Sequence, residues 1–169
     1  MNQDSIVIRP VEDRDTDFIL RLNEENVEVL APMDEQRLEQ YKGWAELFLV
    51  AEVDGKSAAF LIAIREGNGE YESENYRWFN SHYDSFLYVD RIVIDTEFRR
   101  AGLGRELYGI VFEQALKDGV PLVTAEIDIE PDYNEGSIRF HEAMGFKEVD
   151  TLVIRNGKLK VSLQTRKMP

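Results

Sequence analysis

The spacing of hydrophobic and polar residues along the chain predicts alternating strands and helices. Short apolar runs and period-two alternation indicate strands, whereas apolar residues at steps of three and four indicate helices. The expected strands cover residues 5–9, 46–53, 57–64, 85–94, 122–129, 146–154 and 159–165. The expected helices cover residues 13–26, 34–41, 100–117 and 134–144. This order predicts a mixed sheet with helices on both of its faces.

Turn residues mark two hairpins within this pattern. Asp54-Gly55 separates the strands over 46–53 and 57–64, and Asn156-Gly157 separates the last two strands. Both dipeptides favour the tight turns that join antiparallel neighbours. The sequence shows no internal repeat and no linker, and 169 residues are enough for one core. We therefore expect a single domain.

A glycine-rich turn follows the strand over 85–94 and opens the helix over 100–117. Residues 99–105 read Arg-Arg-Ala-Gly-Leu-Gly-Arg. Glycines let the backbone approach a ligand closely, and the free N–H groups of a helix N-terminus attract anions. The turn is suited to a pyrophosphate, although an ordinary connection between a strand and a helix explains the local spacing equally well.

Two common phosphate motifs do not match this turn. Gly104 is followed by Arg105 and Glu106, whereas the P-loop of nucleotide hydrolases requires Lys and then Ser or Thr. Leu107 stands where the dinucleotide fingerprint has its third small residue. Neither a P-loop nor a dinucleotide fold is expected.

A second motif, further along the chain, favours one interpretation of the glycine turn. Residues 134–146 read Asn-Glu-Gly-Ser-Ile-Arg-Phe-His-Glu-Ala-Met-Gly-Phe. In this order, the two motifs resemble those of the GNAT superfamily of acyl-CoA N-acyltransferases. Arg99, Gly102 and Gly104 match the pyrophosphate signature of that family. The second signature is matched at Asn134, Ser137, Phe140, Gly145 and Phe146, while His141 stands where the family usually has tyrosine.

The resemblance implies a fold and a cofactor. The fold is α/β (α+β), with a mixed, mostly antiparallel sheet of about six to seven strands, helices on both faces, and a splay between strands 4 and 5. The whole chain, 1–169, would form one N-acetyltransferase domain that uses acetyl-CoA as acyl donor and contains no metal. The residues expected to bind the coenzyme are Ile92, Val93, Ile94, Arg99, Arg100, Ala101, Gly102, Leu103, Gly104, Arg105, Asn134, Ser137 and Phe140. The backbone of 92–94 would pair with the pantetheine arm, and one of its N–H groups would polarise the thioester carbonyl.

Glu126 is the first candidate for the catalytic base. Alternation along the strand over 122–129 places Thr124, Glu126 and Asp128 on one face. Some members of the family carry a glutamate base at the position of Glu126, and Asp90 on the preceding strand is the reserve candidate. Solvated or ion-paired surface carboxylates explain the pattern equally well.

His141 is the second catalytic candidate. In the family, the tyrosine at this position protonates the departing thiolate, and an imidazole can perform the same task. The alternative is a structural histidine bonded to a neighbouring carbonyl. Ser137 precedes His141 by one helical turn, but no nucleophile elbow surrounds it. Asn134 is expected to contact the coenzyme, to cap the helix, or to do both.

The stretch over 66–85 is too long and too aromatic for a plain loop. Aromatic rings near carboxylates suit a cationic amine, so we expect one wall of the acceptor site here. A lid or a dimer interface explains the aromatic residues equally well. The residues expected to bind the acceptor are Glu25, Asn26, Tyr76, Trp78, Asp90 and Asp128.

Composition narrows the partners. A formal charge of −13 disfavours nucleic acid, and the absence of cysteine excludes thiol chemistry. The two histidines lack the spacing of a zinc site, and no apolar run is long enough to span a bilayer. With no leader peptide evident, we expect a soluble, cytoplasmic protein that does not bind membranes, with a homodimer as one option.

The function expected from these features is acetyl-CoA-dependent N-acetylation. The acceptor would be a primary amine, either a small cationic amine or the N-terminal amine of a peptide, and transfer would be direct within a ternary complex. The alternative is a catalytically weak or inactive acyl-CoA-binding sensor or interaction module, which the replacement of tyrosine by His141 would favour.

Overall fold

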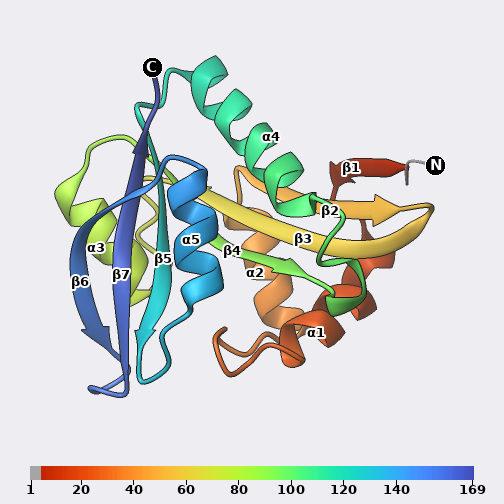
Figure 1. Ribbon diagram of the computed structural model, residues 1–169, viewed down its shortest axis with the longest axis horizontal. Helices are drawn as coiled ribbons and strands as arrows, with labels where there is room; N and C mark the ends of the chain where they lie inside the picture. The colour runs from red at the N-terminus through yellow and green to blue at the C-terminus, as the bar shows by residue number, and fades with distance from the viewer. Residues whose placement is uncertain (1–4) are drawn as a thin grey trace. The chain divides into compact units, whose positions relative to one another are not determined.

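A computed structural model of the protein describes residues 5–169 and contains the strands and helices labelled in Figure 1. The strands are β1 (Ile6–Pro10), β2 (Leu47–Val53), β3 (Lys56–Arg65), β4 (Leu87–Ile94), β5 (Leu122–Glu130), β6 (Lys147–Ile154) and β7 (Leu159–Lys167). The α-helices are α1 (Thr16–Glu24), α2 (Glu35–Trp44), α3 (Glu74–His82), α4 (Leu103–Asp118) and α5 (Glu135–Ala143). Two 3-10 helices, η1 (Asp13–Asp15) and η2 (Thr96–Phe98), precede α1 and α4.

The sheet has seven strands and confirms the expected fold class. The pairs β1–β2, β2–β3, β5–β7 and β6–β7 are antiparallel, and β4 pairs with β5 in parallel. The chain forms two compact units. The first unit contains residues up to Ile64 and Arg91–Val111, and the second unit contains Arg65–Asp90 and Phe112–Pro169. β4 and α4 contribute residues to both units.

In the first unit, β1, β2 and β3 form an antiparallel meander. Ile8 of β1 pairs with Ala51 of β2, and Val50 of β2 pairs with Phe60 of β3. The turn between β2 and β3 has positive φ at Asp54 and Gly55, which confirms the expected hairpin. β2 and β3 are buried along most of their length, and the core also holds side chains of α1 and α2, among them Ile19, Leu22, Leu38 and Tyr41.

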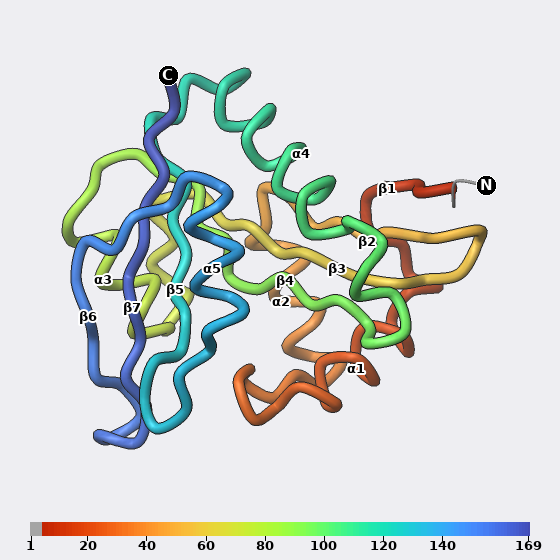
Figure 2. Tube along the Cα trace, viewed as in Figure 1, coloured from red at the N-terminus to blue at the C-terminus, as the bar shows by residue number. Residues whose placement is uncertain are grey.

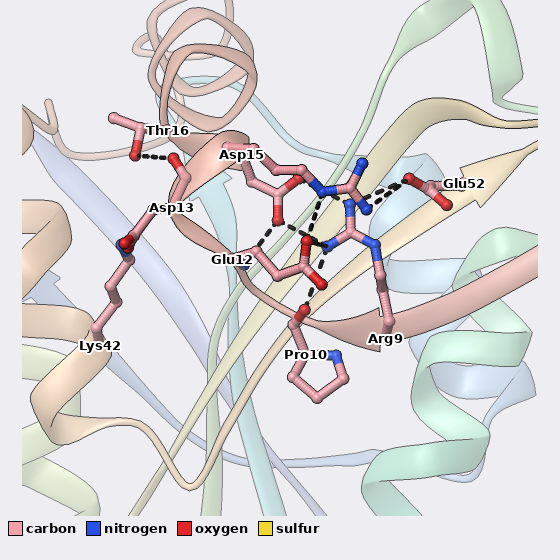
Figure 3. Close-up of polar contacts among 9 residues, drawn as sticks. Arg9, Pro10, Glu12, Asp13, Asp15, Thr16, Lys42 and Glu52 are labelled. Atoms are coloured by element: carbon pink, nitrogen blue, oxygen red, sulfur yellow. Dashed lines mark hydrogen bonds and ion pairs between the residues drawn. The ribbon is translucent and has the colours of Figure 1, made fainter.

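An ionic network joins β1, η1 and β2 in the first unit. Figure 3 shows the Arg9 guanidinium between two carboxylates, with Nη1 at 2.7 Å from Asp15 Oδ2 and Nη2 at 3.1 Å from Glu52 Oε1. Asp15 also accepts the Glu12 N–H at 2.8 Å. Burial alone would raise the pKa of Asp15, but these hydrogen bonds and the Arg9 charge hold it below its usual range. The network therefore fixes the start of α1 relative to the strands.

In the second unit, β5 lies between β4 and β7. The ladder with β4 pairs Leu87 with Val123 and Tyr88 with Thr124, and the short length of this ladder is what the expected splay requires. β5 pairs with β7 along most of its length, and β7 pairs with β6, so that β5, β7 and β6 lie side by side in Figure 1. The turn between β6 and β7 has positive φ at Asn156 and Gly157, as the second expected hairpin requires.

The helix α3 is the element that the pattern analysis missed. It lies within the segment between β3 and β4, which Figure 2 draws in yellow-green. Ser73 caps the helix by accepting the Tyr76 N–H, and Asn75, Tyr76 and Phe79 are buried at helical spacing. The rings of Tyr76 and Phe79 lie 5.6 and 5.7 Å from that of Tyr88. Core packing therefore accounts for much of the aromatic content of this segment.

Candidate active site

The glycine-rich turn lies in the first unit and ends at the N-terminus of α4. The helix begins at Leu103 rather than at residue 100 as expected, because Gly102 adopts a φ of +79° that a helix does not contain. A Cβ at Gly102 would meet no atom within 4 Å, so the backbone conformation is what favours glycine here. The first helical hydrogen bond runs from the Glu106 N–H to the Gly102 carbonyl, and the amides ahead of it have no intrahelical acceptor.

Three arginines surround this helix start. Arg99, Arg100 and Arg105 are all exposed, in a protein whose net charge is −13. Positive charge and helix-terminal N–H groups suit an anionic ligand such as a diphosphate. The features of the turn fit the coenzyme that the motif predicts.

The residues over 92–94 form the last part of β4 in the first unit. Val93 is buried, whereas Ile92 and Ile94 are half-buried. The strand ends where the Asp95 N–H donates to the Ala58 carbonyl at 2.8 Å and the Asp95 side chain caps η2. Their pairing with a pantetheine arm stays a prediction.

Three carboxylates gather on β4 and β5 in the second unit, and we call Asp90, Glu126 and Asp128 the carboxylate cluster. The Tyr88 hydroxyl donates to Glu126 Oε1 at 2.8 Å. Burial raises the pKa of Glu126 from 4.5 to about 8, and the charges of Asp90 and Asp128 act in the same direction. The side chains of Tyr88 and Asn75, which lie beside this carboxyl group, partly oppose the rise. Glu126 is therefore protonated in a large fraction of molecules at neutral pH.

Two residues of the segment between β3 and β4, Tyr71 and Asn75, lie beside the carboxylate cluster. The sequence did not indicate either of them as a partner of these carboxylates. The buried Tyr71 hydroxyl donates a short hydrogen bond to Asp90 Oδ1. The side-chain amide of Asn75, which is 8% exposed, lies beside Glu126. The feature of the sequence that could have indicated Asn75 is Ser73, a helix-capping residue, followed by Asn75 directly before Tyr76, which is buried.

His141 lies on α5 in the second unit and is 4% exposed. Its Nδ1 donates to the Ser137 carbonyl at 2.8 Å, as in the structural alternative raised above. Burial lowers the pKa of His141 and the hydrogen bond to Ser137 opposes that shift. The rings of Phe140 and Phe146 lie 5.5 and 5.1 Å from the imidazole, so the side chain is enclosed by aromatic edges and faces.

Both ends of α5 are fixed by side chains. Asn134 Oδ1 accepts the Ser137 N–H at 3.2 Å, which confirms its role as helix cap. At the other end, Arg166 of β7 donates from Nε to the Met144 carbonyl at 2.9 Å, and its guanidinium lies 3.9 Å from the ring centroid of Phe112. The position of His141 therefore depends on contacts from α4 and β7 as well as on α5.

The other expected acceptor residues have partners of their own. The buried Tyr76 hydroxyl donates to the Arg65 carbonyl at 2.7 Å and accepts the Asn68 N–H at 2.8 Å. The Trp78 ring is stacked on His82 at 3.8 Å. In the first unit, Glu25 pairs with Arg21, and Asn26 donates to a carbonyl at the end of α1. Among the expected acceptor residues in the second unit, Asp90 and Asp128 are the ones that act electrostatically on Glu126.

Within residues 5–169, no three histidine, aspartate or glutamate side chains are grouped as metal ligands would be. Over the same residues, no helix combines the length and hydropathy needed to cross a bilayer.

The model of the acetyltransferase (GNAT) family matches residues 14–146. The chain belongs to this family. A curated relative is the uncharacterized N-acetyltransferase MJ1207 of Methanocaldococcus jannaschii, with 27% identity over 106 residues. That match covers 62% of this chain and 41% of the relative, so the chain spans less than half of the length of that relative.

Solved structures share the GNAT fold over nearly the full chain. Ard1 of Thermoplasma volcanium superimposes with a TM-score of 0.77 at 16% identity, covering 97% of this chain and 98% of that one. Arabidopsis thaliana Naa50, solved with the bisubstrate analogue CoA-Ac-MVNAL, gives a TM-score of 0.71 at 16% identity. The Naa50 match covers 96% of this chain and 98% of that one. At these identities the likeness establishes the fold.

Proposed function

We propose that the protein is an acetyl-CoA-dependent N-acetyltransferase that acetylates a primary amine directly. The observation that carries this proposal is the buried Glu126 carboxyl, bonded to Tyr88 and beside Asp90, in a chain of the GNAT family. A base with a pKa near the working pH is what removal of a proton from an ammonium ion requires. Coenzyme A complexes among structures with this fold support the choice of donor.

The coenzyme would be held chiefly by the glycine turn. The N–H groups at the start of α4 and the side chains of Arg99, Arg100 and Arg105 would bind its diphosphate. The backbone over 92–94 would hold the pantetheine arm, and Asn134, Ser137 and Phe140 are proposed as further contacts. When bound, acetyl-CoA supplies a thioester carbonyl that the amine nitrogen attacks, so that a C–N bond forms and the C–S bond breaks.

Glu126 would act on the acceptor. The amine enters protonated, and the ionised Glu126 carboxylate takes one proton from it, directly or through water. Tyr88 is buried, and burial raises its pKa, so its hydroxyl stays protonated and remains a donor to Glu126. Asp90 and Asp128 would hold positive charge near the base.

His141 would return a proton to the leaving sulfur. Because Nδ1 donates to Ser137, Nε2 is the nitrogen that would carry the transferred proton. Burial lowers the pKa of His141, so its protonated form is a stronger acid than an exposed imidazolium. The structural alternative is that the hydrogen bond to Ser137 serves only to stabilise α5.

The proposal is tested by acyl transfer and by binding of the coenzyme, measured separately. A panel of polyamines, amino acids and peptides with free N-termini is screened for amine-dependent release of the coenzyme thiol. Coenzyme A at 100 times its Kd should stabilise the protein by about 2.7 kcal/mol in thermal unfolding. Thermal stabilisation without turnover of any primary amine would favour the acyl-CoA sensor, and the absence of both would contradict either function.

A further inference from the structure

Three buried side-chain oxygens in the second unit have no hydrogen-bond partner among the described residues. They are Oδ1 of Asn75, Oγ1 of Thr124 and Oε2 of Glu126, from α3 and β5. Buried polar atoms are normally paired, because an unpaired one loses its hydration without compensation. Glu126 and Asn75 are moreover neighbours, since the Asn75 side chain acts on the pKa of Glu126. A bound ligand that forms hydrogen bonds with these oxygens would explain why several of them lack a partner in one unit.

The two nearby tyrosine hydroxyls are already engaged in protein contacts. The Tyr88 hydroxyl donates to Glu126 Oε1, and the Tyr71 hydroxyl donates to Asp90 Oδ1. What remains at this place are oxygens that can accept hydrogen bonds, beside the negative charges of Asp90 and Asp128. A cation with N–H donors satisfies the Asn75 Oδ1 and the ionised form of Glu126, whereas Asp90 and Asp128 repel an anionic carboxylate or phosphate.

Asn75 is not needed to hold α3 in place. The helix is fixed by Tyr76 and Phe79, whose rings pack against Tyr88, and by the two hydrogen bonds of the Tyr76 hydroxyl. Phe79 also lies 6.2 Å from Phe86. These contacts place Asn75 beside Glu126 while its Oδ1 bonds to no described residue.

We propose that Asn75 is a specificity-determining residue that binds the protonated primary amine of the acceptor together with Glu126. This inference rests on the proposed function, and it adds which amines the site takes. A primary ammonium has three N–H donors, and every methyl group added to the nitrogen removes one of them. The site therefore selects primary amines over methylated ones at the step of binding.

Binding of the cation has a second consequence. The groups that act on Glu126 are Asp90 and Tyr88 of β4, Asp128 of its own strand and Asn75 of α3. Arg155 acts in turn on Asp128, and the Tyr71 hydroxyl donates to Asp90. A bound ammonium adds a positive charge to this set and favours the ionised carboxylate. The proton of Glu126 then leaves to the buffer as the amine binds at neutral pH.

The experiment titrates the protein without acetyl-CoA at pH 7. The probes are n-butylamine, N-methylbutylamine and butyltrimethylammonium, and calorimetry in buffers of different ionisation enthalpy counts the protons released. We expect n-butylamine to bind at least about 10-fold more tightly than the trimethyl compound, as the loss of charge-assisted hydrogen bonds implies. Proton release should accompany binding and disappear in Glu126→Gln. Equal affinity for the three probes would overturn the proposal.

A matched pair of variants on α3 tests Asn75 itself. Asn75→Leu keeps the shape and removes the acceptor, and it should weaken n-butylamine binding about 10-fold or more. Ser81→Ala, at an exposed position of the same helix, should leave binding unchanged. Unchanged affinity in Asn75→Leu would contradict the proposal. If that variant does not fold, the ranking of the three probes on the unmodified protein decides.

The outcome for the site and the outcome for the proposed function can be told apart. Coenzyme A binding, followed by thermal unfolding, should be the same in the unmodified protein and in Asn75→Leu. Amine selectivity with no coenzyme binding would leave the Asn75 assignment standing and contradict the proposed transferase. Coenzyme binding and turnover without amine selectivity would contradict the Asn75 assignment alone.

Discussion

The surroundings of Glu126 disfavour its ionised form, although its proposed role as a base requires the ionised carboxylate. Burial and the neighbouring Asp90 raise its pKa to about 8. An exposed glutamate would be fully ionised at pH 7 but would be a weaker base. The raised pKa therefore makes the Glu126 carboxylate a stronger base. It also lowers the fraction of molecules in which Glu126 is ionised at pH 7.

This environment predicts two opposite pH dependences. The rate constant kcat/KM should rise with pH up to about 8, the pKa of the free protein, and the rise should be lost in Glu126→Gln. The free energy of unfolding should fall between about pH 4.5 and 8, because the folded state keeps a proton that the unfolded state releases. Activity profiles and denaturant unfolding at several pH values measure the two. A stability that increases over this range in the unmodified protein, relative to Glu126→Gln, would contradict the assignment.

His141 allows a second test with a single substitution. We expect His141→Phe to lower kcat by ~100-fold, because positioned acids contribute that much or more. The coenzyme affinity should barely change, since the expected phosphate contacts lie on another segment. Steady-state kinetics together with thermal shifts by coenzyme A separate the two effects. An unchanged kcat would remove His141 from the mechanism and leave its hydrogen bond to Ser137 as its role.

Some residues of the candidate site could be predicted from the sequence, and others could not. Glu126 and Asp128 could be found because alternation places them on one face of a strand, and Asp90, the reserve candidate on the preceding strand, does interact with Glu126. Asn75 and Tyr71 could not be found in the same way. Their places beside Glu126 and Asp90 result from the packing of α3, which is a property of contacts distant in sequence rather than of local periodicity.

At the level of elements, local turn chemistry gave correct predictions, whereas the aromatic clustering was misleading. The hairpins at Asp54-Gly55 and Asn156-Gly157 were predicted from turn chemistry, which is local. The helix α3 was missed because its buried aromatic residues suggested a ligand wall and concealed the spacing of Tyr76 and Phe79. The start of α4 was placed too early because Gly102 interrupts an otherwise helical sequence.

The junction before α4 gives a prediction with an internal control. Gly102→Ala places a side chain on a residue with φ of +79°, which should destabilise the protein by about 1 kcal/mol and weaken coenzyme A binding. Gly109→Ala lies within the same helix, where alanine is favoured by about 1 kcal/mol and a Cβ meets no atom within 4 Å. Chemical denaturation and coenzyme titration compare the variants. Equal effects at the two positions would argue against a special role of the turn.

At the level of the whole molecule, the acidic excess acts on both expected substrates in opposite directions. A net charge of −13 attracts a cationic amine at long range and repels an anionic coenzyme, whereas the arginines at the start of α4 would attract the coenzyme locally. The expectation of one domain over the whole chain stays a prediction, since the chain forms two compact units. Net charge is the property at this scale that the sequence gives without any structure.

Salt provides the test at this scale. Raising ionic strength from about 0.05 to 0.5 M shortens the screening length severalfold, so kcat/KM for a diamine should fall and should fall more than for a monoamine. A neutral salt series at constant pH, with butylamine and 1,4-diaminobutane as acceptors, measures the difference. Identical slopes for the two amines would show that the surface charge does not steer the acceptor.

The stacking of Trp78 on His82 makes α3 an optical reporter. The protein has two tryptophans, and the other, Trp44, lies at the end of α2 against the ring of Tyr41 and the guanidinium of Arg37. A Trp44→Phe variant would leave Trp78 as the only indole emitter, one helical turn from Asn75. Fluorescence of that variant would then report, in real time and without a label, whether α3 moves when an amine arrives.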